Sequence, residues 1–168
     1  MNPVVVVQLT QDELLELQTY VDALRDWHHE QGHRDKMPGK TEDELRAYDL
    51  KGRAGEYALA KHLGLEYQYS LGYEENRDVH GYEVRTRSKH HYDLFTFDTD
   101  RDGIYVLATT TNNRVVMLHG WTTLRETLQP DRHAPWMKRP CYLTPRDQLY
   151  PMAFLPSATS HTKNTTPA

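Results

Sequence analysis

The sequence predicts an α/β (α+β) domain in which a mixed β-sheet is flanked by two N-terminal helices. Two segments, Thr10–Glu13 and Thr41–Glu44, have the Thr-x-x-Glu form of a capping box, and leucines follow each at helical spacing. From residue 66 onward the pattern changes to short segments rich in aromatic and β-branched residues, with turn residues between them. The proline-rich stretch 130–156 then predicts an irregular C-terminal strap.

The first helix is predicted over residues 11–30, and the second from its capping box to about Leu63, with Gly64 as its stop. Gly52 and Gly55 lie inside the second helix, where each costs about 1 kcal/mol relative to alanine. This pair predicts that another element packs close to the helix backbone. The predicted buried stripe of this helix consists of Leu45, Tyr48, Leu59 and Leu63.

Alternation and β-branched content predict the strands, and Asn112-Asn113 predicts a hairpin turn. A short helix is predicted over 121–128. A single domain therefore occupies residues 1–156, and the polar residues 157–168 are predicted to form a disordered C-terminal tail. The predicted strands are 4–7, 66–71, 82–88, 94–97, 104–110, 114–119 and 141–143.

Composition narrows the classes of function. The formal net charge of -4 does not indicate a nucleic-acid-binding protein, so any such contact needs a local basic patch. The single cysteine, Cys141, excludes an internal disulfide framework and a cysteine-rich zinc cluster, and it suits a reducing cytoplasm. The apolar run Val4–Val7 is too short for a signal peptide or a membrane span. We therefore expect a cytoplasmic location and no membrane partner.

The stretch from Asp78 to Ser88 carries the candidate chemistry. On a strand, Glu83, Arg85 and Arg87 share one face, and a tight turn at His80-Gly81 brings Asp78 close to Glu83. Two carboxylates and a fixed cation on one surface suit a site that binds a hard metal ion and handles phosphate. The alternative is an ion-paired, solvated edge strand. A third carboxylate, Glu56, comes from the second helix, beside the glycine pair.

Taken together, Gly52-x-x-Gly55-Glu56, then Asp78, then Glu83-x-Arg85 resemble the PD-(D/E)XK nuclease superfamily. The chain also resembles uncharacterised phage and prophage proteins of that type across residues 45–155, for example at Tyr105-Val-Leu and Gly120-Trp121. The resemblance implies a restriction-endonuclease-like fold and a Mg²⁺-dependent (or Mn²⁺-dependent) DNA endonuclease. A phage-encoded protein would work in the host cell cytoplasm. The implied catalytic residues are Glu56, Asp78, Glu83 and Arg85, of which Asp78, Glu83 and Glu56 would hold the metal.

One departure from the superfamily pattern bears on catalysis. Arg85 stands where the nuclease has lysine, and an arginine stays protonated, so it cannot take a proton from water. It can grip a phosphate bidentately. The alternative is therefore a non-catalytic module on the same fold, which binds nucleic acid or a host protein. Pairing into a homodimer also stays open.

Cations interleaved with an aromatic residue lie in and around the predicted strand 82–88, and they could contact phosphates and stack on bases. Their alternative is an ordinary exposed strand end, since the overall balance is acidic. The predicted nucleic-acid-binding residues are Arg77, Arg87, Lys89, His90, His91 and Tyr92.

Two further motifs are weaker. His29-Glu-Gln-Gly-His33 matches the H-E-x-x-H pattern of zinc hydrolases, but Gly32 weakens the helix inside the motif, and we expect a solvated helix end. The stretch Asp98–Gly103 resembles half of a calcium loop, and Thr109 stands where the closing glutamate is needed. We therefore expect a polar turn between strands there.

Overall fold

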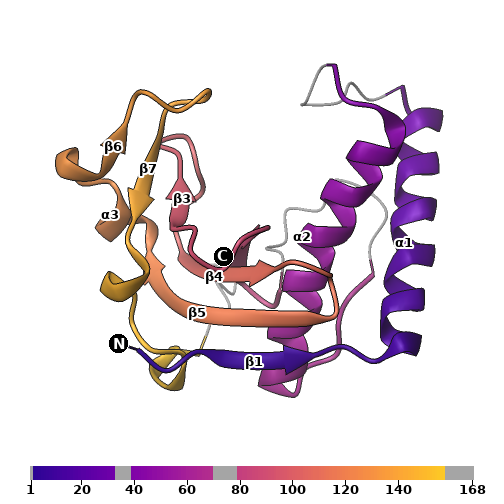
Figure 1. The fold of residues 1–168 in the computed structure, drawn as a ribbon, viewed down its shortest axis with the longest axis horizontal. Coiled ribbons are helices and arrows are strands. Elements are labelled where there is room, and N and C mark those ends of the chain that lie inside the picture. The colour runs from indigo at the N-terminus through magenta and orange to yellow at the C-terminus, as the bar shows by residue number, and fades with distance from the viewer. Residues whose placement is uncertain (1, 33–38, 70–78, 158–168) are drawn as a thin grey trace, which may run out of the picture.

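The computed structural model describes residues 2–32, 39–69 and 79–157. It has a mixed α+β architecture, which confirms the predicted fold class (Figure 1). The helices are α1 (Gln11–Glu30), α2 (Glu42–Leu63) and α3 (Leu124–Thr127). The strands are β1 (Val5–Gln8), β2 (Tyr82–Arg87), β3 (Leu94–Thr96), β4 (Ile104–Thr110), β5 (Val115–Thr123), β6 (His133–Ala134) and β7 (Cys141–Thr144).

The strands form two sheets. The main sheet has the order β1-β5-β4-β2, in which β2 and β4 are parallel and the other neighbours are antiparallel. A smaller antiparallel sheet has the order β3-β7-β6. Figure 1 shows α2 between α1 and the main sheet, and the small sheet at the other end of the curved strands β4 and β5.

Local sequence determines the ends of the two long helices. Thr10 and Thr41 each form the predicted reciprocal capping box, with Glu13 and Glu44 respectively. At the other end of α2, Gly64 adopts a left-handed conformation with φ 68°, in which its N–H binds the last helical carbonyls. Both capping signals act within a few residues, so the sequence alone locates these ends.

The core lies mainly between α2 and the main sheet. Ala54, Ala58 and Leu59 of α2 pack there with Val84 and Val106. Small residues let the helix approach β2 closely: a Cβ at Gly55 would lie 1.9 Å from Oγ1 of Thr86. The close backbone approach predicted from the glycine pair is therefore confirmed at Gly55. At Gly52 the same Cβ would meet nothing within 4 Å.

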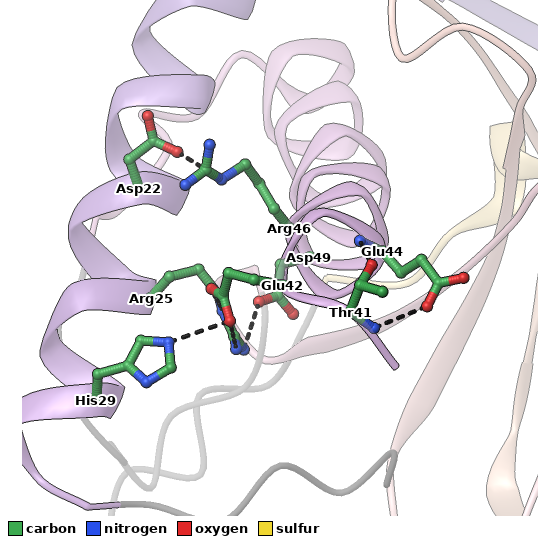
Figure 2. Close-up of polar contacts among 8 residues, drawn as sticks. All are labelled: Asp22, Arg25, His29, Thr41, Glu42, Glu44, Arg46 and Asp49. Atoms are coloured by element: carbon green, nitrogen blue, oxygen red, sulfur yellow. Dashed lines mark hydrogen bonds and ion pairs between the residues drawn. The ribbon is translucent and has the colours of Figure 1, made fainter. Parts of the chain in front are cut away.

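An ion-pair cluster joins α1 to the start of α2 (Figure 2). The buried guanidinium of Arg25 donates to Glu42 at 2.9 and 3.1 Å and to Asp49 at 3.4 Å. His29 also contacts Glu42, with 3.1 Å between Nε2 and Oε2. The hydrogen bonds from Arg25 hold the pKa of Glu42 well below its ordinary value, at about 2. The cluster therefore links the C-terminal part of α1 to the N-terminal part of α2.

Two predicted elements and one predicted core residue differ from the structure. Residues 66–69 form no strand, and the rest of that predicted strand lies outside the described residues. Residues 121–123 continue β5, so the short helix begins only at Leu124. Tyr48 is 49% exposed and does not belong to the buried stripe of α2. Of the described helices, none combines the length and the apolar character that crossing a membrane requires.

Candidate functional site

Strand β2 carries the candidate residues on one of its two faces. A tight turn precedes it: Val79 and Tyr82 pair, and both turn residues, His80 and Gly81, have positive φ. Val84 packs toward α2, so alternation turns Glu83, Arg85 and Arg87 to the opposite face, as the sequence predicts.

Arg85 is held in place on that face by Asp100. Its Nη2 lies 2.9 Å from Oδ2 of Asp100, and its guanidinium carbon lies 5.4 Å from the ring centroids of both Phe95 and Tyr105. Asp100 belongs to the turn between β3 and β4 and also accepts a hydrogen bond from Phe97 N–H at 2.8 Å. Arg85 is thus fixed by an ion pair and two rings.

Glu83 lies beside Tyr105 in the parallel pairing of β2 with β4. Burial raises the pKa of Tyr105 to about 12, with further increases from the negative charges of Asp100 and Glu83. Both carboxylates therefore act on the same phenol, close to Arg85. The described residues bring together Glu83, Arg85 and Asp100, and Asp100 is the member that sequence reasoning read only as a turn residue.

Glu56 is buried on the α2 side of the sheet, where it has its own partners. Arg53 Nη1 donates to its two oxygens at 3.2 and 3.0 Å, and the hydroxyl of Tyr67 donates to Oε2 at 2.8 Å. Burial raises the pKa of Tyr67, and the negative charge of Glu56 raises it further. Glu56 and Glu83 thus occupy different sides of β2.

Two predicted residues, Arg77 and Asp78, lie outside the described residues. Whether Asp78 approaches Glu83 therefore stays a prediction, whereas Glu56 lies on the other side of β2 from Glu83. Across residues 2–32, 39–69 and 79–157, no three His, Cys, Asp or Glu side chains gather in a group that could hold a metal ion.

Several of the predicted nucleic-acid-binding residues gather around one ring. The guanidinium carbon of Arg87 lies 4.3 Å from the Tyr92 ring centroid, Lys89 Nζ lies 5.6 Å from it, and the His91 ring packs edge-on at 4.8 Å. Arg87 also donates to the carbonyl of Asp93 at 2.8 Å. The structure therefore places these cations and Tyr92 side by side at the end of β2.

The small sheet extends this cluster. Arg87 also lies 5.3 Å from the Phe95 ring, Phe95 packs edge-on against Phe97, and the guanidinium carbon of Arg139 lies 3.7 Å from the Phe97 centroid. We refer to the whole set as the cation–aromatic surface; it consists of Arg87, Lys89, His91, Tyr92, Phe95, Phe97 and Arg139.

Sequence reasoning missed three members of this surface. Phe95 and Phe97 are two residues apart, and this spacing could have revealed them, because it puts both rings on one face of an extended segment. No local signal pointed to Arg139. It reaches Phe97 only because the chain returns through β7, which pairs with β3.

His90 is turned into the protein instead of lying on the cation–aromatic surface. Its Nδ1 lies 2.6 Å from Oγ1 of Thr109, and the same hydroxyl lies 2.7 Å from Nε2 of the buried His119. Burial lowers the pKa of His119 to about 4, and the positive charges of Arg146 and His90 act in the same direction. The His90 carbonyl accepts a hydrogen bond from Arg146. The position of His90 indicates a structural role.

The zinc-hydrolase motif is only partly described. His29 is exposed near the end of α1 and pairs with Glu42, and His33 lies outside the described residues. The stretch Asp98–Gly103 is the polar turn that the sequence predicts, with Asp100 at its centre.

Comparison of the chain with protein-family models, with curated proteins and with solved structures found no match.

Proposed function

We propose that this protein binds single-stranded DNA along the cation–aromatic surface. One observation supports this most: Arg87, Lys89 and Arg139 lie over or beside aromatic rings on one continuous surface. Proteins that bind single strands combine cations that follow the phosphate backbone with rings on which bases stack. A local surface of this kind can bind DNA despite the net charge of -4. At about 0.1 M salt, carboxylates more than about 10 Å away are largely screened.

The cations on this surface and beside it differ in whether an ion pair already engages them. Arg87 and Lys89 take part in none of the ion pairs among the described residues. Arg85, by contrast, is paired with Asp100. A phosphate approaching from solvent would therefore meet Arg87 and Lys89 first, with Arg85 as a fixed neighbour.

To test the proposal, the affinity of the protein for a labelled oligonucleotide is measured by fluorescence anisotropy at several salt concentrations. The single-stranded and duplex forms of the same oligonucleotide are compared. We expect tighter binding of the single strand. We also expect Tyr92→Leu or Arg87→Gln to weaken single-strand binding by roughly tenfold or more, the typical worth of a stacked base or a charged contact. Arg125→Gln is the matched control, because Arg125 is an exposed cation of α3. Equal affinity of all three variants would refute the proposal.

A second candidate function is Mg²⁺-dependent hydrolysis of a phosphodiester in the bound strand. The position of Glu83 favours it, because this carboxylate shares the face of β2 with Arg85 and Arg87. Magnesium is held by one or two carboxylates and keeps several waters, which fits Glu83 together with the predicted ligand Asp78. A bound Mg²⁺ would supply charge stabilisation at the phosphate. Arg85 would hold a phosphate oxygen, since it cannot act as a base.

Calorimetric titration with Mn²⁺ and an assay of DNA cleavage test this second function. We expect Glu83→Gln to remove both metal binding and cleavage while leaving single-strand binding in metal-free buffer intact. Asp131→Asn, an exposed carboxylate remote in sequence, is the control. Absence of cleavage in the unaltered protein with Mg²⁺ or Mn²⁺ would leave a binding module, as the replacement of lysine by Arg85 predicts.

A further inference from the structure

A pocket of about 300 Å³ lies where the N-terminal half of α2 faces the carboxyl ends of β2 and β4. From α2, Glu44, Tyr48 and Lys51 line it, at the spacing of one helical face. From the strand ends come Ser88 and Thr110, the latter at the start of the β4–β5 turn. Lys40, Thr111 and Asn113 complete the polar lining.

Positive charge predominates in this pocket. Lys40 and Lys51 are its two cations, and Arg87 is close enough to act on Lys51. Burial lowers the pKa of Lys51, and the positive charge of Arg87 lowers it further. Lys51 takes part in no ion pair among the described residues; its Nζ lies 5.1 Å from the Tyr48 ring centroid.

The one carboxylate of the pocket lining already has a local partner. Oε2 of Glu44 accepts a hydrogen bond from the backbone N–H of Thr41 at 2.8 Å, within the capping box of α2 (Figure 2). The described lining therefore carries two cations, Lys40 and Lys51, and one carboxylate that is already engaged at the helix start. An anion in the pocket would be attracted by both lysines, which together outweigh the single carboxylate.

The other polar groups of the pocket suit the oxygens of an anion. Ser88 and Thr111 are exposed there and carry hydroxyl donors, and Asn113 carries an amide donor. The Thr110 hydroxyl, in contrast, already donates to the carbonyl of Val115 at 2.8 Å. Lysines with neutral donors around them form a phosphate-binding combination.

We propose that this pocket binds a terminal phosphate monoester of the nucleic acid that the cation–aromatic surface holds. The inference rests on the proposed function for the polymer to which the phosphate belongs. A phosphate monoester carries about -1.5 to -2 at pH 7, against -1 for a backbone diester, and so matches two lysines better. Arg87 is the last residue of β2 and Ser88 follows it directly, so the cation–aromatic surface and the pocket are adjacent at the end of this strand. The end of a DNA strand bound on the cation–aromatic surface would then enter the pocket.

The experiment compares one oligonucleotide sequence in three forms: with a 5′ phosphate, with a 3′ phosphate and with neither. We expect one phosphorylated form to bind about tenfold more tightly than the form without phosphate, as one charge-assisted contact predicts. Lys51→Gln should abolish that preference and leave binding of the form without phosphate unchanged. The control Lys89→Gln should weaken all three forms equally. Equal binding of all forms, or a preference that survives Lys51→Gln, would overturn the inference.

An experiment with free inorganic phosphate distinguishes two outcomes: that the pocket binds no phosphate, and that the protein binds no DNA. Thermal unfolding is followed in inorganic phosphate and in chloride at equal ionic strength. Stabilisation by phosphate that Lys51→Gln removes, in a protein that binds no DNA, would support the pocket for a free phosphate monoester and refute the cation–aromatic surface. DNA binding without any preference for a terminal phosphate would refute only the pocket.

Discussion

Arg85 and Asp100 form an ion pair that ties the middle of β2 to the turn between β3 and β4. Their charged atoms are 2.9 Å apart, with side-chain exposures of 25% and 14%, and the guanidinium lies beside the rings of Phe95 and Tyr105. Arg85 thus links the two sheets, because Tyr105 belongs to β4 and Phe95 belongs to β3. This role explains why an arginine suits the position, because its flat, charged group can stack and pair at once.

The first prediction concerns that ion pair. Asp100→Asn removes the counterion of Arg85, so the arginine becomes available to phosphate, and single-strand affinity measured by anisotropy should increase by roughly three- to tenfold. The free energy of unfolding in urea should fall by about 1–3 kcal/mol, because the substitution weakens a charged hydrogen bond. Asp98→Asn, in the same turn and exposed, is the control and should change neither quantity. Unchanged affinity in Asp100→Asn would show that Arg85 does not reach the ligand.

The second prediction concerns the buried carboxylate of Glu56. Tyr67→Phe removes the hydroxyl that donates to Glu56 at 2.8 Å, and it should lower the free energy of unfolding by about 1–3 kcal/mol, because the acceptor is charged and buried. Tyr69→Phe is the matched control: its hydroxyl donates to the exposed Glu16 at 3.3 Å, so its loss should have little effect. Urea denaturation measures both, and equal losses would contradict the special role of Tyr67.

The third prediction uses the two glycines of α2. Gly55→Ala would bring a Cβ to 1.9 Å from the Thr86 hydroxyl, so we expect a loss of about 1–3 kcal/mol from overpacking. Gly52→Ala meets nothing within 4 Å and should raise stability by about 0.5–1 kcal/mol through better helix propensity. Thermal and urea unfolding of the two variants should therefore move in opposite directions. A stabilised Gly55→Ala would disprove the close approach of α2 to β2.

The fourth prediction is a pH dependence at the α1–α2 cluster. Glu42 has a folded-state pKa lowered from 4.5 to about 2, chiefly by its hydrogen bonds from Arg25. Its stabilising contribution is therefore complete above pH 4.5 and is lost as the pH falls from 4.5 toward 2. Glu42→Gln should lower the melting temperature at pH 7 and flatten its dependence on pH between 4.5 and 2. Glu30→Gln, an exposed carboxylate at the end of α1, should keep the dependence of the unaltered protein.

The elements that local signals specify were predicted well. Capping boxes at Thr10 and Thr41 and the stop at Gly64 define α1 and α2. Alternation located β2, and β-branched and aromatic content located β4. Predictions failed where tertiary contacts decide. Trp121 was read as the start of a helix, but its backbone pairs with Tyr150, so β5 continues through it. Tyr48 fits the helical stripe by spacing, yet it is exposed and lines the pocket between α2 and the ends of β2 and β4.

The sequence by itself determined the fold class, both long helices and the side of β2 on which Glu83, Arg85 and Arg87 lie, because capping and alternation act over a few residues. Only the tertiary structure decided which residues become neighbours. It paired Arg85 with Asp100, buried Glu56 against Tyr67 on the other side of β2, and brought Arg139 to Phe97. These contacts join residues far apart in the chain, and they depend on how the sheets and helices pack.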